Sequence, residues 1–379
     1  MSYLDYNLKT VPTGWRKVLY LNWPLVFLLA SVASIGFLML YSVAGGDAST
    51  WAEPQMKRFV VGMLAMFVIG FTPVWFWRNV SLPAYIFAFT LLLGVEFFGS
   101  VGKGAQRWIE LGPLRIQPSE LMKIGLVMLL AAYYDWLDTK KVSHPFWVAI
   151  PVVMILAPTF LVLKQPDLGT AILLVAGGGA VMFAAGVSFW YFGTVLALVG
   201  ALVFTVFESR GTDWQLIEDY QFRRIDIFLD PGADPLGSGY NITQAKIALG
   251  SGGWGGKGYM QGTQSHLNFL PEKHTDFIFT TLAEEFGFVG AASLLALYVL
   301  IVGFCFQSAM SNKDRYAALL TYGIATTFFL FFGVNMGMVT GLMPVVGVPL
   351  PLVSYGGTAM IILLSAFGLV QSAHIHRPR

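Results

Sequence analysis

The sequence of 379 residues predicts an all-α, polytopic integral membrane protein with ten transmembrane helices and a large extracytoplasmic loop between helices seven and eight. Hydrophobic residues make up 56% of the chain and charged residues only 12%, whereas soluble domains contain about 45 to 50% apolar residues. Apolar runs of about 17 to 25 residues recur along the chain, and each could cross a bilayer core of about 30 Å as a helix. Residues 1–379 therefore form a single membrane domain.

The apolar runs define the ten spans in order, with bounds good to about two to four residues. They cover residues 24–44, 59–74, 81–98, 119–134, 146–163, 168–186, 189–207, 281–306, 316–338 and 352–373. An even number of spans places both termini on one side. The polar segment 1–22 lacks the short apolar region and small-residue cleavage site of a signal peptide, so we expect an uncleaved first helix.

Basic residues indicate the orientation, because Lys and Arg gather in cytoplasmic segments. Ten lie on the side of the termini and seven on the other side, which favours cytoplasmic termini. The ten are Lys9, Arg16, Lys17, Arg78, Lys140, Lys141, Lys313, Arg315, Arg377 and Arg379. The seven are Lys57, Arg58, Lys103, Arg107, Arg115, Lys123 and Lys164. Those on the outer side oppose the usual bias, and an anionic ligand at that surface would explain them.

The long loop, residues 208–280, is then periplasmic. Its first part has helical spacing of apolar residues with charges between them, which is typical of a helix lying along the membrane interface. The spaced positions are Trp214, Ile217, Gln221, Ile225 and Phe228. A short helix is predicted over residues 241–249. Seven glycines between Gly250 and Gly262 either let the backbone approach another segment closely or keep this turn flexible.

Charge and cysteine content exclude two classes of function. The formal net charge is +2 and the 23 basic residues are scattered, so no basic stripe or tail indicates a nucleic-acid partner. The single cysteine, Cys305, lies within an apolar run. It provides no disulfide framework, and we expect it to be a small buried side chain.

Ionisable groups at membrane depth cost roughly 2.5 to 3.5 kcal/mol each, so they usually form pairs or serve a site. In "RIQPSELMKIG", Pro118 suits a first helical turn, and Glu120 and Lys123 lie three apart on one helix face. They are either a structural ion pair or part of a binding site. Because Lys123 lies about one turn into the apolar run, where a structural pair would gain little, it is a candidate site residue.

Two further polar segments lie at the outer ends of predicted spans. In "GKGAQRWIELG", the planar guanidinium of Arg107 beside Trp108 is suited to phosphate, although such pairs also serve as interface anchors. In "KQPDLGT", Lys164 and Asp167 lie at the turn between two spans. Asp167 could bind substrate or cap the following helix.

The segment "FLPEKHTDFIFTT", residues 269–281, carries charged residues just before an apolar span. Asp276 is deep enough to be partly desolvated, which would raise its pKa, and Lys273 and His274 could adjust it. Such a carboxylate could be the general base for a hydroxyl nucleophile. The alternative is a charge that favours a helix N-terminus, but Thr281 and Glu284 already match a capping box.

The motifs taken together resemble the SEDS family of polytopic membrane proteins, named for shape, elongation, division and sporulation. The resemblance runs from about residue 20 to the C-terminus, and the last segment is similar to the elongation branch of the family. The matching segments are "GKGAQRWIELGPLRIQPSELMK", "KQPDLGTA", "YQFRRIDIFLDP", "GGWGGKGYMQGTQSHLNFLPEKHTDFIF", "AEEFGFVG" and "GLMPVVGVPLPLVSYGGTAM".

The resemblance implies a peptidoglycan glycosyltransferase of the bacterial inner membrane that polymerises lipid II on the periplasmic side during cell elongation and rod-shape maintenance. The essential aspartate of the family falls on Asp276, its Arg-Trp arginine on Arg107, and its Glu and Lys on Glu120 and Lys123. A class B penicillin-binding protein and other proteins of the elongation complex are the implied partners. No cofactor is certain; a divalent cation could assist the diphosphate leaving group, although no cluster has clear metal-ligand spacing.

Two other functions remain open from the sequence. A flippase that moves lipid II would also use charges in a cavity, but transporter sites usually lie near mid-membrane between internal repeats, and this chain shows its richest cluster in a loop. A non-catalytic scaffold for cell-wall enzymes would not need the Asp276 carboxylate. Polymerisation of lipid II by an Asp276→Asn variant separates these functions.

Overall fold

The computed structural model describes residues 14–102, 105–111, 114–212, 214–230, 238–267, 269–270 and 272–377. Three of the basic residues used to predict orientation lie outside these ranges: Lys9, Lys103 and Arg379. So does most of the predicted N-terminal segment, of which the structure describes residues 14–22, including the 3-10 helix η1 (Gly14–Tyr20).

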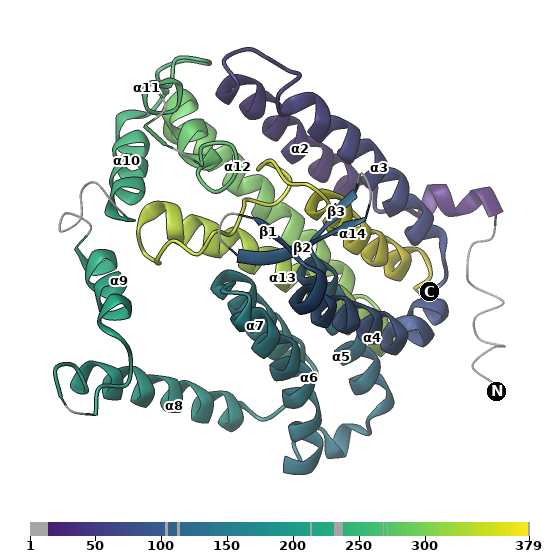
Figure 1. Ribbon diagram of the computed structural model, residues 1–379. Helices are drawn as coiled ribbons and strands as arrows, with labels where there is room; N and C mark the ends of the chain where they lie inside the picture. Colours follow the sequence, from purple (N-terminus) through teal and green to yellow (C-terminus); the bar gives the residue numbers. More distant parts are fainter. Residues whose placement is uncertain are drawn as a thin grey trace.

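Each of the ten predicted spans coincides with a long helix, so the fold class is confirmed (Figure 1). These helices are α2 (Trp23–Val43), α3 (Ala52–Phe71), α4 (Val74–Phe98), α5 (Pro118–Trp136), α6 (Pro145–Lys164), α7 (Leu168–Ala184), α8 (Phe189–Glu208), α12 (Ile278–Met310), α13 (Arg315–Thr340) and α14 (Ala359–Ile375). Among the described helices, seven are by themselves long and apolar enough to cross a membrane. Of the other three, α5 carries three charged residues, and α7 and α14 are 17 residues long.

Three spans begin seven residues away from the start that hydropathy predicts, and one of them is α3, which begins at Ala52 and not at 59. Helix α4 begins at Val74, seven residues early, because Arg78 is neutralised by Asp135 on α5 and Asp314 before α13, at 3.2 and 2.8 Å. Helix α14 begins at Ala359, after a non-helical segment that contains Pro349 and Pro351. Proline lacks an N–H group and fixes its φ angle, so this apolar segment does not form a helix.

The loop between α4 and α5 forms a small antiparallel sheet that the sequence analysis did not predict. Its strands are β1 (Ser100–Gly102), β2 (Ala105–Leu111) and β3 (Leu114–Ile116), in the order β1-β2-β3. Glu110 pairs with Arg115 across β2 and β3, and the two side chains also form an ion pair of 3.5 Å. Strand β2 contacts the adjoining ends of α4 and α5.

Glycines allow the bundle helices to pack closely. A Cβ on Gly62 of α3 would lie 2.6 Å from Leu364 of α14, and one on Gly368 of α14 would lie 2.8 Å from the main chain of α3. On α7, a Cβ at Gly178 would lie 2.7 Å from Ile155 of α6. Helix α13 runs through the middle of the bundle and contacts α5, α7, α12 and α14. As predicted, Cys305 is buried, on α12.

Helix α8 differs from the rest, because none of its residues is buried. Figure 1 shows it extending away from the bundle. Its first turn is anchored by the Tyr191 hydroxyl, which donates to the Ser143 carbonyl at 3.0 Å. The remainder is apolar and exposed, as expected of a helix surrounded by lipid.

The described part of the loop from α8 to α12 contains three short helices. They are α9 (Asp219–Leu229), α10 (Ser238–Ser251) and α11 (Thr263–His266). A helix is present in the segment predicted to be helical, but it begins at Asp219, so Trp214 and Ile217 precede it. The helix expected over 241–249 is confirmed as the middle of α10, which packs against α12 and α13.

Candidate active site

Asp276 lies half-buried in the turn directly before α12. Its carbonyl accepts a hydrogen bond of 3.0 Å from Asn335 Nδ2 on α13. Its carboxylate points at the backbone of Gly347, which has a φ angle of +69°; a Cβ built there would lie 3.7 Å from Asp276 Oδ2. The carboxylate thus lies beside the non-helical segment between α13 and α14.

His274 is packed between aromatic rings. Its imidazole stacks on Trp51, with ring centres 4.6 Å apart and planes within 4°, and its ring centre is 6.2 Å from that of Tyr355. The Arg58 guanidinium covers the other ring, at 4.8 Å from its centre, and donates to the Tyr355 hydroxyl at 3.2 Å. Cation–π contacts of this kind hold a guanidinium without neutralising it.

The remaining charged residues of this turn face the loop. Lys273 Nζ donates to the Ser265 carbonyl of α11 at 2.7 Å, and burial lowers the pKa of this ammonium. The Thr275 hydroxyl donates to Glu272 Oε2 at 2.8 Å. In this turn, Lys273 therefore binds α11, His274 stacks with rings and Asp276 faces Gly347.

Glu120 and Lys123 line a mainly apolar cavity, partly open to the surroundings, between α5, α13, α14 and the segment that precedes α14. The predicted pair is confirmed, with Lys123 Nζ 2.7 Å from Glu120 Oε1. Lys123 is only 4% exposed, and its ammonium lies 3.8 Å from the centre of the Phe331 ring. A charged pair thus borders a mainly apolar cavity.

Arg107 and Asp167 form a second pair, with Nη1 and Oδ2 3.8 Å apart. Arg107 on β2 also donates to the carbonyls of Gln165 and Pro166, so it holds the turn between α6 and α7. Asp167 caps α7 by accepting from the Thr170 main-chain N–H at 3.2 Å, so the capping interpretation is confirmed. The Arg107 contacts leave some of its five N–H donors for another anion.

The segment between α13 and α14 connects these groups. A Cβ on Gly169, near the start of α7, would lie 2.5 Å from the Val348 side chain, so the helix capped by Asp167 packs against the segment that contains Gly347, the residue that the Asp276 carboxylate faces. At the other end of the segment, Ser354 lines the cavity and its hydroxyl donates to the Thr275 carbonyl. Asp276, the Arg107–Asp167 pair and the Glu120–Lys123 cavity therefore adjoin one segment.

The capping box predicted at the start of α12 is wrong. The helix begins at Ile278, and its N-cap, Phe277, makes no side-chain cap. Thr281 and Glu284 both lie inside the helix; the Thr281 hydroxyl has no hydrogen-bond partner among the described residues, and Glu284 binds the loop. Because no side chain caps α12, a role for Asp276 as the charge that favours this helix N-terminus stays open.

Helix α12 is broken at Gly287, whose φ of 64° and ψ of −161° are not helical. The Gly-rich loop fills the break. The main-chain N–H groups of Lys257 and Gly258 bind the carbonyls of Glu284 and Glu285, both at 3.0 Å. In turn, the N–H groups of Phe288 and Val289 bind the carbonyls of Gly253 and Trp254, at 2.8 and 3.2 Å. Thus two carbonyls before the break and two N–H groups after it have partners in the loop.

Glycine is required because the two backbones approach so closely. A Cβ on Gly252 would lie 2.0 Å from the Ala283 carbonyl oxygen, and one on Gly256 would lie 2.0 Å from the Glu285 carbonyl oxygen. Of the two interpretations of the glycine-rich turn, close backbone approach is therefore the right one at these positions. The piece of α12 before the break, residues 278–286, directly follows Asp276.

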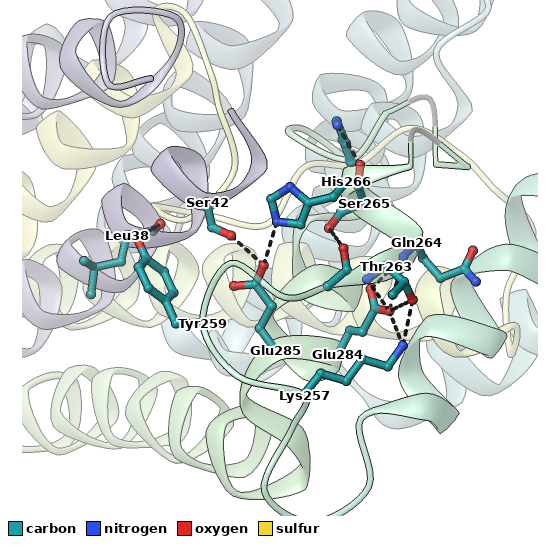
Figure 2. A network of polar contacts seen from close by, with 12 residues as sticks. Leu38, Ser42, Lys257, Tyr259, Thr263, Gln264, Ser265, His266, Glu284 and Glu285 are labelled. Atoms are coloured by element: carbon teal, nitrogen blue, oxygen red, sulfur yellow. Dashed lines mark hydrogen bonds and ion pairs between the residues drawn. The ribbon is translucent and has the colours of Figure 1, made fainter. Parts of the chain in front are cut away.

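Two buried carboxylates lie beside the break: Glu284, which the sequence analysis assigned to a capping box, and Glu285, which it did not single out (Figure 2). Glu284 accepts from Lys257 Nζ at 2.6 Å and from the Thr263 N–H at 2.9 Å, at the start of α11. Glu285 accepts from the Ser42 hydroxyl of α2 and lies 3.5 Å from His266 Nε2. The signal was present as "AEEFG", two adjacent carboxylates inside an apolar run, where charges are costly.

Comparison with known proteins identifies the family of this chain. The model of the FtsW, RodA and SpoVE cell cycle proteins matches residues 22–379. The chain belongs to this family. The resemblance to SEDS proteins drawn from the motifs is thereby confirmed. Peptidoglycan glycosyltransferase MrdB of Escherichia coli (strain K12) is 41% identical over 367 residues, which are 96% of this chain and 96% of MrdB.

Solved structures of the FtsW/RodA/SpoVE family have the same fold. The crystal structure of the rod shape determining protein RodA of Thermus thermophilus matches with a TM-score of 0.71 and 30% identity, covering 95% of this chain and 98% of RodA. A chain of a peptidoglycan synthase complex matches with a TM-score of 0.81 and 32% identity, covering 93% of this chain and 97% of that chain. These matches agree with the elongation branch that the motif before α14 indicated.

Proposed function

We propose that this protein is a peptidoglycan glycosyltransferase that polymerises lipid II into β(1→4) glycan strands during cell elongation. One observation carries the proposal: the turn that contains Asp276 is bonded through Ser354 to the wall of an apolar cavity that holds the Glu120–Lys123 pair. A lipid-linked substrate needs both an apolar space and a positive charge near it. The identity of 41% with the glycosyltransferase MrdB supports the same activity.

The proposed reaction begins with Asp276 as general base. Its carboxylate takes the proton from the 4-hydroxyl of the acceptor GlcNAc, and that oxygen attacks the anomeric carbon of the donor MurNAc. The bond from this carbon to the diphosphate oxygen breaks, and the lipid diphosphate leaves with the electron pair. Attack opposite the leaving group inverts the anomeric carbon and gives the β linkage.

The basic residues have separate roles in this proposal. Lys123, which Glu120 orients at 2.7 Å, attracts the diphosphate from the cavity, and Arg107 contributes its remaining N–H donors while it holds Asp167 and the turn before α7. Lys273 and His274 support the turn of Asp276 and contribute to binding substrate. Within the described residues, no group of three or more His, Cys, Asp or Glu side chains could hold a metal ion, so the proposal assigns no step to a cation.

Location and partners follow from the same proposal. Both termini are cytoplasmic, and the loop with Asp276 is on the periplasmic side of the inner membrane, where a class B penicillin-binding protein would crosslink the new strands. The matching chain from a complex that coordinates polymerization and crosslinking supports this pairing.

The test is polymerisation of lipid II by the purified protein, together with a partner synthase inactivated in both its glycosyltransferase and transpeptidase sites. We expect Asp276→Asn to lose at least about 100-fold in rate, since general-base catalysis contributes about 10² to 10⁴. Asp226→Asn is the matched control, because Asp226 is a partly exposed carboxylate of α9 that is paired with Arg210 at 2.7 Å. Unchanged glycan product from Asp276→Asn would refute the catalytic role, and lipid movement in vesicles without polymer would indicate a flippase.

A further inference from the structure

Three consecutive carbonyl groups at the candidate base are each bound from one side. The Tyr355 N–H donates to the His274 carbonyl at 2.9 Å, the Ser354 hydroxyl donates to the Thr275 carbonyl, and Asn335 Nδ2 donates to the Asp276 carbonyl at 3.0 Å. All three donors belong to α13 or to the segment that follows it. The main chain of the turn is therefore fixed before any substrate binds.

Asn335 differs from the other two donors because its side-chain amide binds two carbonyl groups. Its side chain is fully buried, at 0% exposure, and its Nδ2 also donates to the Val348 carbonyl at 2.7 Å. Val348 adjoins Gly347, the residue that the Asp276 carboxylate faces. One amide group thus connects the main chain of Asp276 to the segment opposite its carboxylate.

The chemistry of the position requires a primary amide. An amide nitrogen has two N–H donors, and here each has a carbonyl acceptor. An aspartate would place acceptors against two carbonyl oxygens, a leucine would leave both carbonyls unpaired, and glutamine is longer by one methylene group. Unpaired buried carbonyls favour local rearrangement, because each loses the interaction it had with water.

We infer that Asn335 is a positioning residue for the transfer reaction, which fixes the Asp276 carboxylate relative to the segment 347–348 and to the cavity. This inference rests on the proposed function. The amide does not touch the reacting atoms, and it acts through the main chain of Asp276. A displacement of about 1 Å at a reacting group can cost about 100-fold in rate, so loss of this amide affects turnover more than substrate binding.

The experiment compares Asn335→Leu with Asn312→Leu in steady-state polymerisation of lipid II. Asn312 is a suitable control because its Nδ2 also donates to a main-chain carbonyl, that of Ala373 at 2.9 Å, but beyond the opposite end of α13. We expect Asn335→Leu to lower kcat by about 10- to 100-fold with KM changed less than about threefold. Asn312→Leu is expected to keep both constants, and the thermal unfolding temperatures of the two variants are compared in the same detergent.

A double variant separates positioning from general damage. If Asn335 acts through Asp276, adding Asn335→Leu to Asp276→Asn causes no further loss of the residual rate. The inference is overturned if Asn335→Leu has the wild-type kcat. It is also overturned if Asn335→Leu lowers the residual rate of Asp276→Asn by the same factor as it lowers the wild-type rate. If Asn335→Leu does not fold, Asn335→Thr, which keeps one donor in less space, is measured instead. Full activity of Asp276→Asn would refute the proposed base itself, which is a different result.

Discussion

Glu120, Asp167 and Glu284 are carboxylates that lie largely out of solvent, and each is stabilised in a different way. Glu120 has an ammonium three residues later on the same helix. Asp167 combines a guanidinium from a strand with the N-terminus of α7. Glu284 accepts from Lys257 and from main-chain N–H groups 20 and 21 residues before it. The Glu120–Lys123 pair and the cap made by Asp167 each join residues three apart in the sequence, which is why the sequence indicated them. The pairing of Asp167 with Arg107 joins distant residues, and the sequence did not indicate it.

The Glu120–Lys123 pair gives a prediction that separates stability from activity. Lys123→Met leaves a carboxylate unpaired in an apolar cavity, and losing one partner of a buried pair costs about 3 to 5 kcal/mol. We expect a lower thermal unfolding temperature and little glycan product. The double variant Glu120→Gln/Lys123→Met should recover most of the stability but not the activity. Recovery of activity in the double variant would show that the pair is only structural.

His376, directly after α14, predicts a pH dependence of stability. Burial lowers its pKa from 6.5 to about 4. The neutral ring is favoured in the folded protein, so its contribution is complete above pH 6.5 and is lost as the pH falls towards 4. The loss reaches about 3 kcal/mol at most. Thermal unfolding at pH 7 and pH 4.5 measures it, and His376→Gln should show a smaller difference between the two pH values.

At the scale of elements, the break in α12 is the feature that hydropathy could not show. The run from 281 to 306 was predicted as one span because Gly287 alone is a weak signal within an apolar helix. The break depends on a loop about 30 residues earlier, whose main chain supplies the missing donors and acceptors. The prediction of a capping box was wrong for the same reason, because the binding partners of Glu284 lie in that loop.

The break predicts opposite effects for two glycines of one helix. A Cβ at Gly287 would lie 2.4 Å from the Gly256 nitrogen, in a backbone conformation that is essentially restricted to glycine. We expect Gly287→Ala to destabilise the protein by about 3 kcal/mol or more. A Cβ at Gly303 of α12 would meet no atom within 4 Å, so Gly303→Ala should be neutral or gain up to about 1 kcal/mol. Thermal unfolding of both variants checks this, and equal effects would contradict the structure.

The non-helical segment before α14 is a second element that the sequence pattern did not predict. Apolar content predicted a tenth span from 352, but Pro349 and Pro351 keep the preceding chain extended, and α14 begins at Ala359. That segment is what brings together Asp276, Asp167 and the cavity. Motif resemblance had selected the same residues, but no spacing rule indicated that Asn335 or Ser354 would hold the turn of Asp276.

At the scale of the whole molecule, the helices divide into a tightly packed bundle and one exposed helix. The contact of α3 with α14 depends on Gly62 and Gly368, whereas α8 has no buried residue. Ten spans could be predicted from hydropathy because every one of them is apolar. The sequence did not predict which of these helices pack together, because the small residues that permit close contact also occur on α8.

This division predicts different tolerance to the same substitution. A Cβ at Gly368 would lie 2.8 Å from the Met66 carbonyl oxygen, while one at Gly200 of α8 would meet no atom within 4 Å. Gly368→Val should therefore destabilise the protein by about 1 to 3 kcal/mol through overpacking. Gly200→Val should leave the unfolding temperature nearly unchanged. A similar loss in both variants would mean that α8 is packed against the bundle.

The loop docked in the break of α12 also links the surface of the molecule to its interior. The amides of Phe288 and Val289 lie in a membrane-spanning helix, but their hydrogen-bond acceptors belong to the loop. Their exchange with deuterated solvent must therefore wait until the loop leaves, even while the rest of α12 stays helical. These two amides would report, within the bilayer, whether a partner bound outside has pulled the loop away or pressed it into place.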